Sequence, residues 1–162
     1  MKIIIISCFL LFTSRAFAQN FTLPDGDYMD TTTNASASCK NYNVYYYDGN
    51  GRHKYPEASS TILKDVRSFL KTKNNSYKGY GYITFQFMID CSGKKMKKTR
   101  VLQTDEKYIN YHFDKRFVAE LYAFLNTMDK WQVFKTRLGE ILSYHAFITL
   151  KIKNGKVINI IP

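Results

Sequence analysis

A regular alternation of apolar and polar side chains runs through residues 80–89, whose sequence is YGYITFQFMI. A period of two is typical of a β-strand that buries one face. The apolar positions of this alternation are Ile83, Phe85, Phe87 and Ile89. The turn-forming residues Asp90-Cys91-Ser92-Gly93 follow, and the segment from Met96 to Gln103 returns with its basic side chains outward. The sequence therefore predicts a long β-hairpin with one side turned to a core.

The segments after this hairpin predict a helix and a second hairpin. Apolar residues recur at helical spacing after Asp114 and stop near Asp129. They are Phe117, Val118, Leu121, Tyr122, Leu125 and Met128. Alternation of apolar and polar residues resumes from Ser143 to Lys153 and predicts another strand. Asn154-Gly155 has the preferred residues of a type I′ turn, so the segment from Val157 to Ile161 is expected to pair with that strand. We therefore expect an α+β fold: an antiparallel sheet with strand-strand-helix-strand-strand order, packed under one helix.

The segments before the first hairpin predict a helix and a smaller hairpin. A helix follows Pro56, with Ser59, Ser60 and Thr61 as candidate N-caps and an apolar stripe at helical spacing. The stripe consists of Ile62, Leu63, Val66, Phe69 and Leu70. A small hairpin is expected between Tyr42 and Tyr55, and the polar residues 19–41 read as a loose leader. The predicted division is residues 19–55 as leader and hairpin, and residues 56–162 as an α+β domain with its core in 79–162.

Residues 1–18 have the pattern of a secretory signal peptide. An apolar run from Ile3 to Phe12 follows Lys2, and Ala16-Phe17-Ala18 offers a small-x-small cleavage site before Gln19. The alternatives are an uncleaved anchor, for which the run is about half the necessary length of ~20 residues, and a lipid-modified Cys8, which would leave almost no signal sequence before it. We expect an exported protein, periplasmic or secreted, with no stable membrane anchor after cleavage.

Length and charge restrict the class of protein. The 162 residues suffice for one modest domain, and the 13 Tyr and 12 Phe supply apolar area for a core. Removing residues 1–18 takes Lys2 and Arg15 from the formal charge of +11 and leaves +9. A basic surface attracts anionic partners, and export makes nucleic acid the least available of them. We interpret the basic cluster Lys94-Lys95-Met96-Lys97-Lys98 as a solvated hairpin rim and expect no nucleic-acid partner.

Two cysteines, Cys39 and Cys91, remain after residues 1–18 are removed. An even number in an oxidising compartment allows one disulfide, and two separate thiols are the alternative, since spacing alone does not show that the Cα atoms approach. The histidines His53, His112 and His145 show no metal-ligand spacing, and no nucleophile elbow, P-loop or GxGxxG is present. We therefore expect a protein that is not an enzyme and has no cofactor or metal.

The pattern from residue 81 onward resembles the C-terminal domain of TonB in its small exported versions. The matching features are the hairpin from Gly81 to Leu102 with Gly93-Lys94 at its turn, the helix that leads into Lys130-Trp131, Gly139, and the strand before Asn154-Gly155-Lys156. Val133 stands where the family usually has proline. The resemblance covers about two-thirds of the mature chain and implies the fold and a protein-binding role in the periplasm, without implying any chemistry.

The resemblance implies that partners bind by adding a strand to the edge formed by the segment 143–153. The segment from Val157 to Ile161 can fold back onto that edge, so an incoming strand would have to displace it or use the next edge outward. We therefore expect truncation after Lys153 to expose the edge and to increase peptide binding or self-association. The side chains along that predicted edge are Ser143, His145, Phe147, Thr149 and Lys151. Trp131 is either a contact residue or a core residue, and its place after the apolar helix favours the core. The implied partner is an envelope protein or peptide, for example an outer-membrane receptor. The alternatives are a secreted inhibitor or host-directed effector on the same scaffold, and a basic binder of anionic glycan or lipid headgroups.

Overall fold

The computed structural model describes residues 27–32, 39 and 55–161. The expected signal peptide and all of the expected small hairpin except Tyr55 lie outside the described residues. Among the described residues, no helix has both the length and the apolar composition needed to cross a membrane.

Two helices and one large sheet make up most of the described chain. In chain order, the elements are β1 (Asp27–Asp30), α1 (Ser59–Lys73), β2 (Tyr80–Ile89), β3 (Lys95–Thr104), α2 (Lys115–Leu125), β4 (Phe134–Lys135), β5 (Ile141–Leu142), β6 (Tyr144–Lys153) and β7 (Lys156–Ile161). Five strands form the large sheet in the order β1-β3-β2-β6-β7, and β4 pairs with β5 separately. Every described strand pair is antiparallel, which confirms the α+β fold class.

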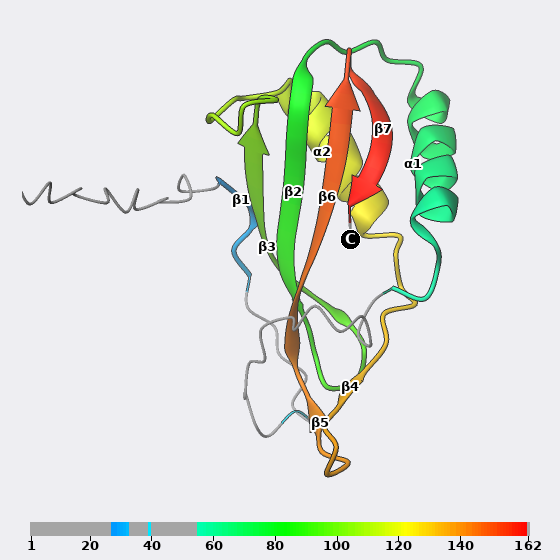
Figure 1. The fold of residues 1–162 in the computed structure, drawn as a ribbon, viewed down its shortest axis with the longest axis vertical. Coiled ribbons are helices and arrows are strands. Elements are labelled where there is room, and N and C mark those ends of the chain that lie inside the picture. The colour runs from blue at the N-terminus through cyan, green and yellow to red at the C-terminus, as the bar shows by residue number, and fades with distance from the viewer. Residues whose placement is uncertain (1–26, 33–38, 40–54, 162) are drawn as a thin grey trace, which may run out of the picture.

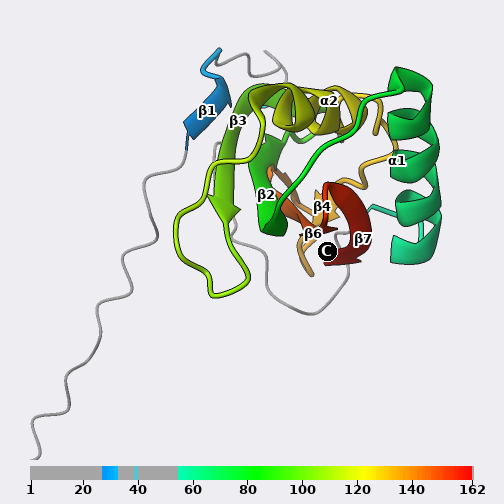
Figure 2. The same ribbon diagram turned by 90° about the horizontal axis from the view of Figure 1, so that it is seen from above.

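The alternation of β2 places one face of the sheet in the core. β2 and β6 pair along their whole length, from Tyr80 opposite Lys153 to Ile89 opposite Tyr144. The apolar positions of both strands are buried, whereas the residues between them are only half-buried. α2 lies across the buried face, and in Figure 2 it runs above the sheet. The predicted sheet and helix thus close around one core by burying apolar area on both sides.

α2 begins and ends for local chemical reasons. The carboxylate of Asp114 accepts hydrogen bonds from the backbone N–H groups of Arg116 (2.8 Å) and Phe117 (3.3 Å), as an N-cap does. The helix ends at Leu125, three residues earlier than its apolar stripe predicts, and Met128 is buried just beyond it. The apolar stripe therefore predicts which residues are buried more accurately than it predicts the last residue of the helix.

α1 covers the side of the sheet that β7 closes. It stands beside β7 in Figures 1 and 2, and the Arg67 Nε donates a hydrogen bond to the Val157 carbonyl oxygen at 2.8 Å. α1 also packs against α2, and its Ile62 and Val66 belong to the same core, so two helices cover the sheet and not the single one expected from the sequence. Ala58 is the N-cap of α1 and makes no side-chain capping bond, so the serine and threonine caps expected from the sequence were wrong.

The hairpin from β6 to β7 turns at Asn154 and Gly155, as predicted. Both have positive φ, 50° and 68°, as a type I′ turn requires. A Cβ atom at Gly155 would lie 2.1 Å from the Tyr77 carbonyl oxygen. Glycine is thus required here both by the backbone conformation and by the close approach of another segment.

Trp131 lies in the core between the sheet and the loop that leads to α1. It is 9% exposed, its Nε1 donates to the Met128 carbonyl oxygen at 2.8 Å, and its ring meets those of Tyr55 and Phe87 edge-on, each at 5.0 Å between centroids. Beside it, a Cβ at Gly93 would approach the Trp131 carbonyl oxygen to 2.9 Å. The indole thus joins the loop before α1 to the β2–β3 hairpin.

Candidate functional site

The two lateral edges of the large sheet differ in how they are covered. β7 lies at one end of the sheet, where α1 packs against it. β1 lies at the other end, and no further described strand pairs with it (Figure 1). An uncovered edge strand presents backbone groups to an incoming chain. The β1 and β3 side of the sheet is therefore the candidate site.

This placement corrects the edge inferred from the resemblance. β6 lies inside the sheet, between β2 and β7, and β7 pairs with its residues from Thr149 to Lys153. Thr149 and Lys151 consequently belong to an interior part of the strand. His145 and Phe147 are half-buried in the part of β6 that β7 does not reach, and burial lowers the pKa of His145. Ser143 is buried just before the strand begins.

β1 comes from the segment that the sequence predicts to be a loose leader, and for these four residues that prediction was wrong. Asp27, Tyr28 and Asp30 pair with Val101, Arg100 and Thr99 of β3, with an irregularity between Tyr28 and Asp30. Met29 packs against the core. A stretch far from β3 in the sequence thus occupies the edge of β3 as an added strand.

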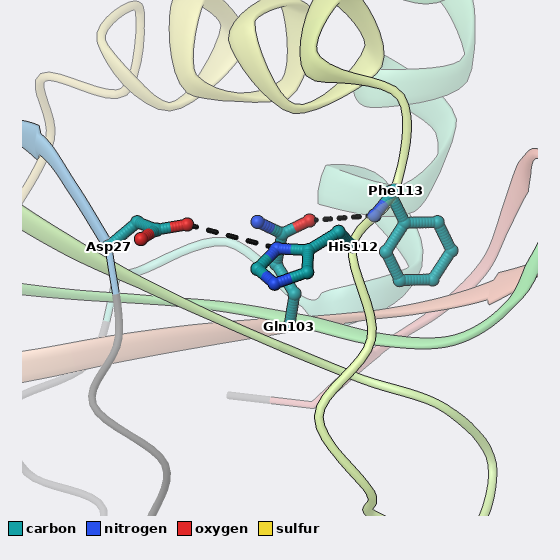
Figure 3. A network of polar contacts seen from close by, with 4 residues as sticks. All are labelled: Asp27, Gln103, His112 and Phe113. Carbon is teal, nitrogen blue, oxygen red and sulfur yellow. Dashed lines mark hydrogen bonds and ion pairs between the residues drawn. The ribbon is translucent and has the colours of Figure 1, made fainter.

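Side chains of neighbouring elements hold β1 in place. The Lys98 ammonium lies 5.5 Å from the centroid of the Tyr28 ring, which is itself 52% exposed. Asp27 Oδ2 lies 3.9 Å from His112 Nδ1, and both side chains are mostly exposed. Figure 3 shows this pair beside the hydrogen bond that the Phe113 N–H donates to Gln103 Oε1 at 3.0 Å. Phe113 is buried and its backbone is held by this hydrogen bond, so the position of the neighbouring His112 beside β1 is fixed as well.

A cavity of about 350 Å³ opens between this edge and the end of α2. Its lining comes from three elements and the loop after α2: Asp30, Lys95, Lys97, Tyr122, Asn126 and Met128. Lys95 is half-buried and its Nζ donates to the Met96 carbonyl oxygen at 3.2 Å and to Thr99 Oγ1 at 3.0 Å. The same ammonium lies 5.4 Å from the Phe87 ring centroid and 5.3 Å from that of Tyr122. The cavity therefore has a cation in its wall that is held by neutral groups.

Burial lowers the pKa of Lys95 from 10.5 to about 8, and the negative charge of Asp30 opposes that shift. The pKa of Lys95 is lower in the folded than in the unfolded chain. Between about pH 8 and 10.5 the unfolded state therefore binds more protons at Lys95 than the folded state does. We therefore expect Lys95 to disfavour folding below about pH 8 and this penalty to disappear as the pH rises to 10.5.

This expectation is checked by urea unfolding of the wild-type protein and a Lys95→Met variant at several pH values from 7 to 10.5. The stability advantage of the variant should shrink as the pH rises. Tyrosines away from Lys95 have the same surroundings in both proteins, so their contribution cancels in the difference. A difference that does not change with pH would contradict the lowered pKa.

The disulfide between Cys39 and Cys91 tethers the segment that follows β1 to the turn of the β2–β3 hairpin. The Cα atoms are 5.6 Å apart. At the same turn the buried Asp90 accepts hydrogen bonds at Oδ1 from the backbone N–H groups of Ser92 and Lys94, each at 2.9 Å. A rigid turn thus carries the covalent link that keeps the β1 segment near β3.

Sequence reasoning missed two parts of this site for identifiable reasons. β1 has only four residues, too few for a periodic pattern to stand out. Lys95 belongs to the predicted solvated rim, and Lys94, Lys97 and Lys98 are indeed exposed while Lys95 turns inward. The register of β3 shifts opposite β2 between Phe87 and Ile89, and no sequence signal marks that shift.

Within the described residues, no cluster of three or more His, Cys, Asp or Glu side chains could hold a metal ion. Comparisons of the chain with protein-family models, curated proteins and solved structures found no match. The fold and the β1 and β3 edge are therefore the basis for a functional proposal.

Proposed function

We propose that this chain is an exported, non-enzymatic binding protein with a domain like the C-terminal domain of TonB, and that it binds an extended segment of an envelope protein or peptide by strand addition. The docking place is the β1 and β3 edge. The observation that carries the proposal is β1 itself, a separate segment of the chain that pairs with β3 as an added strand.

The shape of this edge supports strand addition. In this mode the main-chain hydrogen bonds provide affinity and pockets beside the strand provide specificity. β3 has ten residues, and β1 has four, so β3 extends beyond β1 at both ends. A partner strand can lengthen the ladder beside β1 or replace β1. At the opposite end of the sheet, β7 is packed against α1.

A second candidate function, binding of anionic glycan or lipid headgroups, has one observation in its favour. Lys94, Lys97 and Lys98 are exposed on the β2–β3 hairpin of a chain with a formal charge of +11. Retention on heparin that disappears at moderate salt would support it, because exposed charges are screened by salt. The inhibitor or effector role remains an alternative use of the same edge.

Strand addition predicts that weakening β1 improves capture of a strand supplied in trans. The probe is a labelled peptide that copies residues 25–32, and the variant is Tyr28→Pro, in which β1 loses a backbone N–H. We expect the full mature variant to bind the peptide at least about tenfold more tightly than the wild type, because the tethered β1 competes at high effective concentration. Fluorescence anisotropy measures the affinity.

The controls are a scrambled peptide and a Leu138→Ala variant, since Leu138 is 89% exposed in the turn between β4 and β5. Amide hydrogen exchange should show protection returning to Thr99, Arg100 and Val101 when the peptide binds. If Tyr28→Pro stays folded and binds the peptide no better than the wild type does, the edge is not the docking site.

A further inference from the structure

We propose that the cavity beside Lys95 is a carboxylate subsite, so that the strand bound at this edge is an acidic segment with Asp or Glu opposite Thr99. This inference rests on the proposed strand addition and names the chemistry of the partner. Nothing in the resemblance to TonB implies an acid at this position.

The state of Lys95 is the first argument. Its ammonium is partly removed from water and donates only to a backbone carbonyl and a hydroxyl, and within the described residues it forms no ion pair. A partly desolvated cation gains most from an anion that reaches it, because the site has already lost part of its hydration. The open cavity gives an anion the room to do so.

The register of β1 is the second argument. Asp30 pairs with Thr99, and Thr99 Oγ1 accepts the hydrogen bond of Lys95 at 3.0 Å. Residues directly opposite on neighbouring strands share a face of the sheet, so the position opposite Thr99 directs its side chain toward the cavity that Asp30 and Lys95 line. A guest strand in the register of β1 would place its own side chain there.

β1 fills this position only in part. Asp30 Oδ1 accepts a hydrogen bond from the Thr32 N–H at 2.7 Å, so this carboxylate is turned to its own chain and acts on Lys95 through charge alone. Glutamate is longer by one methylene and extends farther toward Lys95. The structure thus favours a guest with Glu over one with Asp at this position, and either over a neutral amide.

The charges around the cavity fit the same partner. The groups that face Lys95 are Asp30 from β1, Lys97 from β3 and the phenol of Tyr122 from α2. When a guest replaces β1, Asp30 leaves the cavity and the ammonium of Lys95 stays in its wall. Lys98, which already holds an aromatic ring at Tyr28, suits an aromatic residue two positions before the acid. An acidic peptide with an aromatic residue is therefore the occupant that matches the edge.

The test uses the Tyr28→Pro mature protein and three peptides that copy residues 25–32 with Asp, Glu or Gln at position 30. We expect the Glu peptide to bind roughly fivefold to tenfold more tightly than the Gln peptide, the scale of one charge-assisted hydrogen bond at a partly exposed site. Adding Lys95→Met should abolish this preference. Adding Lys107→Met, at an exposed lysine remote from the cavity, should preserve it.

A second readout is the titration of Lys95 by NMR of its side chain. Binding of the Glu peptide should raise the pKa of Lys95, so the preference for Glu should fade as the pH rises above about 8, where the free amine loses its proton. The Gln peptide should leave the titration nearly unchanged.

The outcomes separate the two proposals. If all three peptides bind equally well, strand addition stands and the carboxylate subsite is wrong. If none binds, the proposed function fails and the subsite fails with it. A preference for Glu that Lys107→Met also removes would show diffuse attraction to a basic chain and overturn the subsite. A wild-type dimer that Lys95→Met dissociates, seen by sedimentation, would make a second copy the occupant instead of a separate partner.

Discussion

Replacing Trp131 with alanine is expected to lower the free energy of unfolding by about 3 to 5 kcal/mol, the range for truncating a large buried aromatic side chain. The indole is 9% exposed and contacts the rings of Tyr55 and Phe87. Its removal leaves a cavity between the hairpin and the loop before α1, and also removes the hydrogen bond to the Met128 carbonyl oxygen. Guanidinium unfolding of the two proteins measures the loss of unfolding free energy, provided that this free energy has the same dependence on denaturant concentration in both.

Two further variants make this prediction specific. Trp131→Phe retains much of the ring and should cost less than alanine does. Leu138→Ala changes an 89% exposed side chain and should stay within about 0.5 kcal/mol of the wild type. Unchanged stability of Trp131→Ala, together with lost binding of the β1 peptide, would reassign Trp131 from the core to the partner contact.

Loss of the Cys39–Cys91 disulfide is expected to cost about 4 kcal/mol, because the link closes a long loop in the unfolded chain. The two cysteines are separated by 52 residues. In the chain-entropy account, the reduced chain gains freedom mainly when unfolded. The measurement compares unfolding of the wild-type protein with and without reductant, alongside a Cys39→Ser, Cys91→Ser double variant.

The same link makes a local prediction about β1. Without it, β1 is tethered at a lower effective concentration, so its amides should exchange faster while those of β2 and β6 remain protected. The reduced wild type and the double variant should agree. Two free thiols in the unfolded, unreduced mature protein would show that no disulfide forms.

The structure also changes what truncation after Lys153 should do. From the sequence, the segment 157–161 covers an edge that its removal would expose. Val157 and Ile160 are buried, however, and α1 depends on Val157 for the hydrogen bond of Arg67. β7 is therefore part of the core, and its removal should unfold the domain instead of opening a binding edge.

Periodic patterns predict the elements of this fold wherever an element is long enough to repeat its pattern. The alternation of apolar and polar residues repeats several times along β2 and β6, and the apolar stripe repeats over successive turns of α2. All three elements form where the sequence predicts them, although α2 ends earlier than its stripe does. Asn154-Gly155 was predicted as a turn because its chemistry is local.

The candidate site depended on features that local patterns do not encode. The edge position of β1 follows from which strands find partners elsewhere, and the burial of Lys95 follows from a register shift in β3 and from the position of α2. Both are consequences of distant segments packing together.

Local sequence patterns are enough to establish the α+β class, the extent of the central hairpin and the apolar faces, because hydrophobic burial follows periods of two and 3.6 residues along the chain. The interior position of β6 and the edge position of β1 arise from the packing of distant segments. The same packing directs Lys95, one lysine of a basic cluster, toward a cavity, and burial there lowers the pKa of its amine to about 8. Burial and electrostatics depend on neighbours brought from far away in the sequence, so they exist only once the chain is folded.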